Sequence, residues 1–595
     1  MCGIFGIVTE HEQPLGDILT DAARRLTYRG YDSVGTATIS GSTIDLRKDA
    51  GRVDEVAEKY NFSEMRGSRG ITQLRWATFG VPSKINAQPH IDSDGDLVGA
   101  HNGNVVNNVA LRQQFTAEGM TVRSENDGES CVHAVERYID QGMDFIPAIQ
   151  RAYQDLEGDY AFVIGQVSDD KLYAFKKGSG LVVGIGEGFT CVSSDLPSIL
   201  PLTRQVIRLE DGEIVTLWSD RVELHSVKDG SLIEREVEIV SETMAAVQKE
   251  GYDHFILKEI HEQPGVAREL LHRLEGDQSL VQLVLDQIAQ ARHVYFIGCG
   301  TSYHACLAGS VYFAQLAGVP IIPVLAPQFA PQYGNAVNGE DVGIFVSQSG
   351  ETKDVLNALE IAQSKGMTCI SLANVIGSTL TRKTDAWLPL VCGYEISVPA
   401  TKTFTNQALT FLYLAARLGG ADLDFDRLPG LMEQTIAEAD PQVQALVPQL
   451  NAWEDLYSLG YGITYAYALE GALKLKEITY AHCEGMLSTE FKHGPLSAVT
   501  DGFPVLFVAG PEDVPLIISG INEVTCRGGE AIVIGEPDPQ LEANATHVIT
   551  IPPSNPAFAA LLSVLPLQLL SYHMAVGRGY DPDFPRNLSK TLTVD

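Results

Sequence analysis

The second residue of the chain is a cysteine, Cys2, and a short apolar run, residues 3–6, follows it. If Met1 is removed, Cys2 carries a thiol and a free α-amine on one residue. An α-amine has a pKa of about 8, so part of it is neutral at about pH 7 and can deprotonate the adjacent thiol. The thiolate is then able to attack an acyl carbon. Taken alone, a cysteine beside apolar residues is more often an ordinary strand residue, so the interpretation depends on the motifs around it.

Two apolar runs farther along the chain end in turns that carry hydroxyl groups. The turns are Cys299-Gly300-Thr301-Ser302 and Ser347-Gln348-Ser349-Gly350-Glu351-Thr352. Each turn opens a predicted helix, and a helix N-terminus with hydroxyl and N–H donors is a ready anion site. The alternative, a dinucleotide site, lacks the third glycine of G-x-G-x-x-G, because Tyr303 occupies that position. One such turn is more often ordinary helix capping, whereas two in one repeat unit favour a phosphate site.

A third set of residues combines acids, bases and a primary amine. Glu470, Lys474 and Glu477 are spaced i, i+4 and i+7, so they share one face of a predicted helix. A solvent-exposed ladder of salt bridges would show the same spacing. His493 follows this helix, and Lys590 stands near the C-terminus. Chain ends are usually frayed, so that lysine alone would indicate nothing.

The elements that must position these groups differ between the two parts of the chain. Residues 1–240 alternate β-rich runs with Gly and Asp turns, and helical stretches interrupt them near 17–26 and 129–140. This pattern predicts an α+β domain, a sandwich of β-sheets between helices. A charged segment, residues 233–251, is predicted to be a linker that runs into a helix. Beyond it, apolar strands alternate with long helical segments, which predicts α/β units with parallel sheets.

The second part contains an internal repeat. Residues 294–303 align with residues 456–465 through two Tyr and two Gly, and the same offset pairs 344–346 with 506–508. Two matches at one offset predict two homologous α/β subdomains. The copies differ chemically, because Ala509-Gly510-Pro511 stands where the first copy has its second hydroxyl-rich turn. We therefore expect one copy to have kept the anion-binding loop.

The 595 residues include 42 Lys and Arg against 76 Asp and Glu, a formal net charge of −34. A chain of this length exceeds one hydrophobic core, so about two to four domains are expected. So acidic a chain repels a phosphate backbone, which argues against nucleic acid and anionic membranes as partners. The apolar stretch 558–576 contains Ser, Pro, Gln and His, and it is predicted to be a buried helix rather than a membrane span.

The nine cysteines form no C-x-x-C pair, and an odd, scattered set indicates neither a disulfide framework nor a zinc site. No charged segment followed by an apolar segment, the mark of a signal peptide, opens the sequence. We therefore expect a cytoplasmic protein without a bound metal.

Several motifs stand in order behind Cys2. They are Tyr28-Arg29-Gly30-Tyr31-Asp32-Ser33, Leu74-Arg75-Trp76-Ala77-Thr78, Asn86-Ala87-Gln88-Pro89-His90, His101-Asn102-Gly103-Asn104 and Ser124-Glu125-Asn126-Asp127. As an ordered set they resemble the class II, N-terminal-nucleophile (Ntn) glutamine amidotransferases over about residues 1–240. The resemblance implies that Cys2 attacks the amide of glutamine and releases ammonia.

The same resemblance implies roles for residues that lie far apart in the sequence. Asn102 and the Gly103 N–H would form the oxyanion hole for the reacting amide. The residues assigned to glutamine binding are Arg75, Trp76, Thr78 and Asp127. Arg75 would pair with the α-carboxylate, which a guanidinium fork suits, and Asp127 would pair with the α-ammonium.

Two positions depart from the pattern of that family, which usually reads W-A-T-H-G and N-A-H-P-H. Phe79 and Gln88 stand where the family has histidines. The replaced side chains are not the nucleophile, its base or the oxyanion donors. Glutamine hydrolysis is therefore expected to survive, while the effect on glutamine affinity and on coupling to a second site stays open.

The second part has an ordered set of its own. It consists of the two hydroxyl-rich turns, the helix around residues 470–477, the run 490–495 and the tail 585–595, behind residues 257–264. This set resembles the sugar-isomerase half of the isomerising glutamine–fructose-6-phosphate aminotransferases, so the resemblance spans nearly the whole chain. It implies conversion of fructose 6-phosphate and glutamine to glucosamine 6-phosphate and glutamate, with no cofactor and no pyridoxal phosphate.

Three residues would then carry the sugar chemistry. Lys590 would form a Schiff base with the open-chain ketose, Glu477 would move a proton between C1 and C2, and His493 would assist ring opening. In this family the histidine comes from the neighbouring subunit, so a homodimer is implied. The residues assigned to the sugar phosphate are Cys299, Gly300, Thr301, Ser302, Ser347, Gln348, Ser349, Thr352, Val398, Lys474 and Ser589. Ala400 departs from the family's serine, which removes a sugar-contacting hydroxyl.

These assignments divide the chain into five parts. They are the amidotransferase domain (1–240), a linker with the helix that leads into the next domain (241–275), the first sugar-isomerase subdomain (276–430), the second (431–585) and a C-terminal catalytic tail (586–595). An internal channel gated by Trp76 would carry ammonia to the sugar, and the tail would close over it.

Three other functions are consistent with parts of this pattern. One is an amidotransferase or deglycase for a different keto-sugar phosphate. Another is a sugar-phosphate-sensing regulator without catalysis, which the intact Cys2, Glu477, His493 and Lys590 oppose. The third is a stand-alone glutaminase, for which sugar phosphate would leave glutamine turnover unchanged.

The acidic composition generates a first prediction. Dense carboxylates repel one another less when salt screens them, so raising KCl towards molar levels should raise the melting temperature or the activity. Thermal unfolding and product formation at low and high KCl measure the effect. If both are indifferent to salt, the charge reflects solubility alone.

Overall fold

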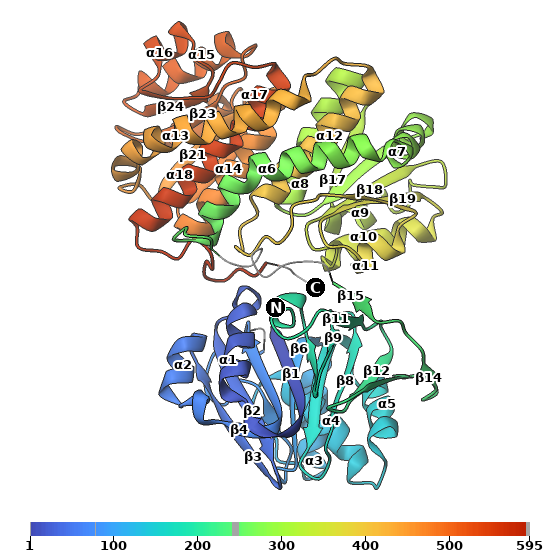
Figure 1. Cartoon of the computed structure of the whole chain (residues 1–595). Helices are drawn as coiled ribbons and strands as arrows, with labels where there is room; N and C mark the ends of the chain where they lie inside the picture. Colours follow the sequence, from blue (N-terminus) through green and yellow to red (C-terminus); the bar gives the residue numbers. More distant parts are fainter. Residues whose placement is uncertain (1, 78, 241–248, 591–595) are drawn as a thin grey trace. The chain divides into compact units, whose positions relative to one another are not determined.

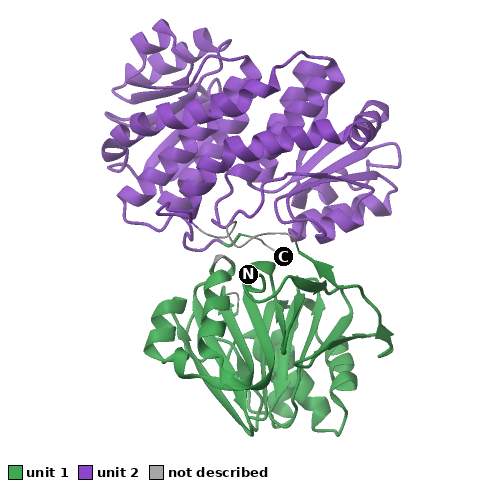
Figure 2. Cartoon of the chain, in the orientation of Figure 1, with its two compact units in different colours: residues 1–247, 589–595 green, residues 248–588 purple. Residues whose placement is uncertain are grey.

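The computed structural model describes residues 2–77, 79–240 and 249–590. The chain forms two compact units, one of residues Met1–Val247 with Ser589–Asp595 and the other of residues Gln248–Leu588 (Figure 2). The first unit contains many short strands, and in the second unit strands alternate with helices, as the change of pattern in the sequence predicted (Figure 1).

Two antiparallel sheets form the centre of the first unit. Across the eight-stranded sheet the described strands are β15 (Glu238–Ile239), β11 (Gln205–Arg208), β9 (Val182–Gly186), β10 (Phe189–Ser193), β1 (Gly3–Pro14), β4 (Arg66–Arg75), β2 (Ser33–Ser40) and β3 (Thr43–Ala50). Across the seven-stranded sheet they are β14 (Leu232–Ile233), β13 (Val222–Ser226), β12 (Glu213–Leu217), β8 (Leu172–Lys177), β7 (Gly158–Gln166), β6 (Leu97–Val105) and β5 (His90–Ile91).

The two sheets pack face to face, and helices cover their outer faces. Ile4 and Val8 of one sheet share a buried core with Val98 and Val163 of the other. The helices are α1 (Gly16–Arg25), α2 (Val53–Lys59), α3 (Asn108–Ala117), α4 (Asp127–Ile139) and α5 (Phe145–Asp155). A second core lies between the seven-stranded sheet and α3 to α5, and α1 packs on β4 and β1. The prediction of a β-sandwich between helices is confirmed.

The second unit contains two parallel five-stranded sheets with the same strand order. One runs β17 (Ile321–Leu325), β16 (Val294–Gly298), β18 (Val342–Ser347), β19 (Thr368–Ala373) and β20 (Ala386–Pro389). The other runs β22 (His482–Leu487), β21 (Asp455–Gly460), β23 (Pro504–Val508), β24 (Glu530–Gly535) and β25 (His547–Thr550). The strands that the sequence repeat aligns, β16 with β21 and β18 with β23, occupy equivalent places. The repeat therefore corresponds to a duplicated parallel sheet.

Helices surround these sheets and fill the space between them. They are α6 (Phe255–Gly276), α7 (Gln278–Gln290), α8 (Thr301–Tyr312), α9 (Ala326–Tyr333), α10 (Lys353–Ser364), α11 (Thr379–Lys383), α12 (Lys402–Gly419), α13 (Leu428–Leu450), α14 (Tyr465–Thr479), α15 (Val514–Thr525), α16 (Pro539–Asn544), α17 (Pro556–Leu562) and α18 (Val564–Gly577). One buried core joins side chains from both sheets through α8, α12, α14 and α18.

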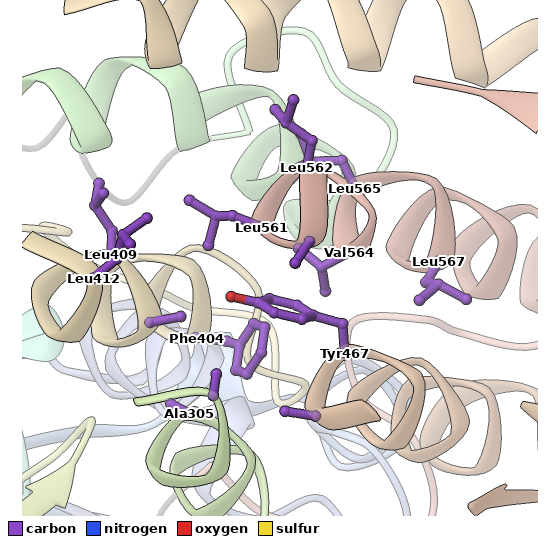
Figure 3. Close-up of a cluster of buried hydrophobic side chains, with 14 of the residues drawn as sticks. Ala305, Phe404, Leu409, Leu412, Tyr467, Leu561, Leu562, Val564, Leu565 and Leu567 are labelled. Atoms are coloured by element: carbon purple, nitrogen blue, oxygen red, sulfur yellow. The ribbon is translucent and has the colours of Figure 1, made fainter. Parts of the chain in front are cut away.

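Tyr467 of α14 lies at the centre of that shared core. Its ring meets Phe404 of α12 edge to face, with the ring centroids 5.7 Å apart. Figure 3 shows Leu561, Val564 and other aliphatic side chains of α17 and α18 around the same ring. Because these helices belong to different copies of the repeat, their common core holds the two copies together as one unit.

Two expectations about particular segments have clear outcomes. The apolar stretch 558–576 forms α17 and α18. Of its 18 most apolar consecutive residues 89% are buried, so these are core helices, and the prediction of a buried helix is confirmed. The charged segment 233–251 is not wholly a linker, because β15 within it pairs with β11. Residues 241–248 of that segment lie outside the described residues.

A buried cluster of charges on α4 stabilises the first unit. His133 of α4 is fully buried between Glu129 and Glu136, and its Nε2 lies 3.6 Å from Glu129 Oε1. Burial opposes a charge on the imidazole, but the two carboxylates raise the pKa of His133 to about 9. The ring is therefore a cation at neutral pH, held by an anion on each side.

The raised pKa of His133 predicts a pH dependence of stability. The ordinary pKa is about 6.5, so the stabilisation is complete below about pH 6.5 and is lost as pH rises towards about 9, by about 3 kcal/mol. His133→Gln should remove this part of the slope in thermal unfolding measured between those pH values. The exposed His11→Gln is the matched control, and an unchanged slope in His133→Gln would contradict the assignment.

Candidate active site

Cys2 directly precedes β1 and contacts β6 of the other sheet and the residue after β4. Its backbone nitrogen donates to Asn102 Oδ1 at 3.1 Å, and its Sγ lies 3.7 Å from the carbonyl oxygen of Trp76. Asn102 belongs to β6 of one sheet, and Trp76 directly follows β4 of the other. The fold thus gathers three of the predicted residues, although they are up to 100 positions apart in the chain.

The environment of Cys2 calls for a base. Burial raises the pKa of its thiol above the ordinary value, so at neutral pH the sulfur keeps its proton until a neighbour removes it. The nitrogen that Asn102 holds is the same nitrogen that becomes the α-amine once Met1 is removed. The observed contact therefore orients the group that is expected to serve as the base.

Arg75, at the end of β4, presents an incompletely satisfied guanidinium. The side chain is fully buried, and its Nη2 donates to the carbonyl oxygens of Phe79 and Gly80. Its Nε and Nη1 have no hydrogen-bond partner among the described residues. An unpaired buried donor costs about 1–3 kcal/mol, so the site favours an anion with two oxygens, such as an α-carboxylate.

Asp127, at the first turn of α4, supplies the opposite charge. Its Oδ2 accepts from the Val105 N–H at 3.0 Å and lies 3.1 Å from His101 Nε2, while Oδ1 accepts from Asn126 Nδ2 at 3.3 Å. Burial opposes ionisation, but His101 and these hydrogen bonds hold the pKa of Asp127 below its usual value. A fully buried anion and a buried cation together match a zwitterionic amino acid.

Sequence reasoning missed several residues that hold this site in shape. Ser194 Oγ accepts from the Ile4 N–H at 2.9 Å and from Asn102 Nδ2 at 3.4 Å. Arg29 bonds the Cys2 carbonyl oxygen and pairs with Asp195 at 3.1 Å. Ser194 and Asp195 follow β10, which pairs with β1, and the sequence contains no signal for that pairing.

The other residues predicted at or near the glutamine-binding site have different outcomes. Thr78 lies outside the described residues. Gly103 adopts φ 129°, and a Cβ there would meet the Asp159 carbonyl oxygen at 2.1 Å, so only glycine fits beside Asn102. Phe79 contributes its carbonyl oxygen to Arg75 rather than its ring. Gln88 is buried against His101.

The two hydroxyl-rich turns lie side by side in the second unit. They follow β16 and β18, which are adjacent parallel strands, so both turns end at the carboxyl edge of one sheet. Ser347 Oγ contacts Thr352 Oγ1 at 2.9 Å and accepts from the Gly350 N–H at 3.0 Å. The Glu351 N–H donates to Ser349 Oγ at 3.1 Å. This compact loop places N–H and hydroxyl donors where a phosphate could bind.

Lys474 pairs with two glutamates of its own helix and links the two copies of the repeat by a hydrogen bond. Its Nζ lies 3.3 Å from Glu470 Oε1 and 2.5 Å from Glu477 Oε2, and it donates to Thr301 Oγ1 of α8 at 3.2 Å. Lys474 and Glu470 are fully buried, so the exposed salt-bridge ladder is ruled out. Burial opposes the ammonium, but the two glutamates raise the pKa of Lys474 to about 12.

Two further residues of this cluster were missed by the sequence analysis. His304 Nδ1 lies 2.8 Å from Glu470 Oε2, and Gln407 Nε2 donates to Ser302 Oγ at 3.0 Å. His304 shares a face of α8 with Thr301 at i, i+3, which is the only signal that could have indicated it.

The other residues assigned to the sugar phosphate lie near the carboxyl edge of this sheet or farther from it. Cys299 and Gly300 connect β16 to α8, and Val398 donates its N–H to the Asp583 carbonyl oxygen at 2.8 Å. His493 is exposed at the end of the short helix Phe491–His493. Ser589 and Lys590 follow Leu588, the last residue of the second unit, so their roles stay predictions.

Models of known protein families match parts of both compact units. Residues 74–200 match the model of a glutamine amidotransferase domain, and residues 287–417 and 449–578 each match the model of the SIS domain. The two SIS matches fall on the two copies of the parallel sheet. Fold and site therefore define a glutamine amidotransferase domain joined to a pair of SIS domains.

Proteins that are similar to this chain along its full length identify a particular family within this class. The glutamine–fructose-6-phosphate aminotransferase [isomerizing] of Methanothermobacter thermautotrophicus is 40% identical over 602 residues, covering 100% of each chain. The enzyme of the same name from Thermococcus kodakarensis is 38% identical over 610 residues, again covering 100% of each. The chain belongs to the family of isomerising glutamine–fructose-6-phosphate aminotransferases.

A solved structure is similar to the second unit. It is the C-terminal domain of glucosamine-fructose-6-phosphate aminotransferase from Francisella tularensis, with a TM-score of 0.52 and 31% sequence identity. The match covers 57% of this chain and 100% of that chain. The prediction of two sugar-isomerase subdomains with parallel sheets is thereby confirmed.

The unpaired guanidinium of Arg75 predicts a specific kinetic effect. Arg75→Lys exchanges a planar fork for a single ammonium, so the KM for glutamine should rise about 10- to 100-fold with a smaller change in kcat. Glutaminase kinetics measure it. Arg69→Lys, in the same strand but bonded to Gln166 and Val167 carbonyl oxygens, is the control. An unchanged KM in Arg75→Lys would remove Arg75 from carboxylate binding.

Proposed function

We propose that this chain transfers the amide nitrogen of glutamine to fructose 6-phosphate and isomerises the product to glucosamine 6-phosphate, releasing glutamate. The observation that carries the proposal is full-length similarity to enzymes of that name, in a chain that contains both an amidotransferase domain and two SIS domains. A stand-alone glutaminase would not need the second unit, and a regulator would not need the buried catalytic groups of the first.

In the first unit, the proposed reaction begins at Cys2. The α-amine takes the thiol proton, the thiolate attacks the glutamine amide, and Asn102 with the Gly103 N–H stabilises the oxyanion. Ammonia leaves as the thioester forms, and water then releases glutamate. Arg75 and Asp127 bind the α-carboxylate and the α-ammonium throughout, because their charges complement a zwitterion.

In the second unit, the donors after β16 and β18 bind the sugar phosphate. These donors belong to Thr301, Ser302, Ser347, Gln348, Ser349 and Thr352. Lys590 of the C-terminal tail forms a Schiff base with the C2 carbonyl of the open-chain ketose, and ammonia then displaces the lysine amine from C2. Glu477 then moves a proton from C1 to C2. Lys474 supports this chemistry by keeping a positive charge beside Glu477, at 2.5 Å.

The assembly and setting are part of the proposal. His493 is exposed, which is consistent with a role in ring opening at the site of a neighbouring subunit, so we infer a homodimer. A channel gated by Trp76 carries ammonia from Cys2 to the sugar. All nine cysteines lie among the described residues without a disulfide, which supports a reducing cytoplasmic setting.

One second candidate has an observation in its favour. Ala400 replaces a family serine and lies partly exposed next to Thr401, so a hydroxyl toward the sugar is lost and another keto-sugar phosphate could be preferred. Product formation from a panel of hexose and pentose phosphates separates the two candidates.

Product analysis with glutamine and fructose 6-phosphate tests the proposal directly. Cys2→Ala should lower glutamine hydrolysis by more than about a thousandfold, because the nucleophile is gone. Lys590→Ala should keep basal glutaminase activity and stop amino-sugar formation. Cys526→Ala, an exposed thiol, is the matched control. Retained glutaminase activity in Cys2→Ala, or continued synthesis in Lys590→Ala, would refute the corresponding role.

A further inference from the structure

Gln88 stands where the amidotransferase pattern has a histidine, and its side chain is completely buried. Both polar atoms of its amide contact the same residue, His101 on β6. Oε1 accepts from the His101 backbone N–H at 2.7 Å, and Nε2 lies 3.1 Å from His101 Nδ1. Gly128 leaves room for this amide, because a Cβ there would lie 2.5 Å from Gln88 Oε1.

These two contacts determine where His101 carries its proton. A backbone N–H only donates, so the Gln88 atom that faces it must be the oxygen, which fixes the orientation of the amide. The other amide atom is then an NH₂ group, which only donates, so His101 Nδ1 must accept. A neutral imidazole with an accepting Nδ1 has its proton on Nε2.

The protonated nitrogen faces the carboxylate of Asp127. His101 Nε2 lies 3.1 Å from Asp127 Oδ2, although the ring is turned so that the N–H does not point straight at the oxygen. At this distance the N–H end of the ring attracts the carboxylate, whereas a lone pair on Nε2 would repel it. The tautomer selected by Gln88 therefore decides whether His101 attracts or repels the Asp127 carboxylate.

The main chain around Gln88 is also held in place. Lys48 on β3 donates from Nζ to the carbonyl oxygens of Ala87 and Pro89, at 2.5 and 2.8 Å. These two residues flank Gln88, so the clamp fixes the position from which its amide reaches His101. The arrangement is thus a chain of contacts that ends at the Asp127 carboxylate.

We propose that Gln88 is a positioning residue for glutamine recognition, which holds His101 as the neutral Nε2–H tautomer beside Asp127. The N–H end of a neutral ring attracts the carboxylate and leaves its negative charge for the α-ammonium of the substrate. An imidazolium would pair with that charge and compete with the ammonium. The inference rests on the proposed function, in which Asp127 binds the α-ammonium of glutamine.

The test is Gln88→Glu in the full-length protein. The change keeps the size and the acceptor for the backbone N–H, but it sets an acceptor against His101 Nδ1. The proton then moves to Nδ1, or the ring becomes a cation. Either state weakens ammonium binding, so the KM for glutamine should rise about tenfold with kcat within about twofold.

A substrate analogue separates this role from a structural one. The inhibition constant of 4-carbamoylbutanoate, which is glutamine without its α-amine, should stay within about twofold in Gln88→Glu. Equal weakening of both ligands, or of neither, would overturn the proposal. Gln73→Glu is the matched control, because Gln73 contacts the backbone carbonyl of His101 at 3.2 Å and should not change the discrimination.

A spectroscopic measurement on the unsubstituted protein does not depend on the folding of a variant. With ¹⁵N-labelled histidine, an unprotonated ring nitrogen gives a signal distinct from that of a protonated one, and the His101→Gln difference spectrum assigns the His101 pair. An unprotonated Nδ1 with a protonated Nε2 is expected, and a protonated Nδ1 would overturn the tautomer. Loss of glutamine hydrolysis in the unsubstituted protein would instead refute the proposed function.

Discussion

An ionised group that is buried must find an opposite charge or hydrogen bonds inside the protein, because it has lost its contact with water. Lys474 meets this requirement within the chain, between Glu470 and Glu477. Arg75 meets it only in part, since Nε and Nη1 have no partner among the described residues. We propose that the difference is functional. A satisfied cluster holds Lys474 in one place, and an unsatisfied guanidinium leaves donors for the proposed substrate carboxylate.

The two folds bring the residues of the candidate sites together in different ways. In the antiparallel sandwich, Cys2 and Asn102 come together because the start of β1 lies against β6 of the other sheet. In the parallel unit, adjacent strands end at one edge, so consecutive turns such as those at Thr301 and Ser347 lie together without distant loops. The duplicated sheet adds α14, which carries Lys474 to Thr301 of the first copy. Duplication thus brings a buried ammonium to the first hydroxyl-rich turn of the other copy.

Gln88 illustrates how a departure from a motif acquires meaning only in context. The exchange of a histidine for glutamine removes an ionisable group, which made glutamine affinity an open question. In the structure, the amide contacts His101 twice and so determines the proton on the ring beside Asp127. An amide has a permanent donor and a permanent acceptor, so its effect does not vary with its own protonation.

The sequence by itself determined the fold class, the duplicated parallel sheet and the candidate nucleophile, because periodicity, repeat offset and motif order can be read directly from the order of the residues. It also indicated that Lys474 shares a helix face with Glu470, since that spacing follows from 3.6 residues per turn. Only the tertiary structure decided that this face is buried, that Asp195 supports Arg29, and that a strand lies within the predicted linker. Burial and long-range strand pairing depend on which surfaces meet, and spacing along one segment carries no information about that.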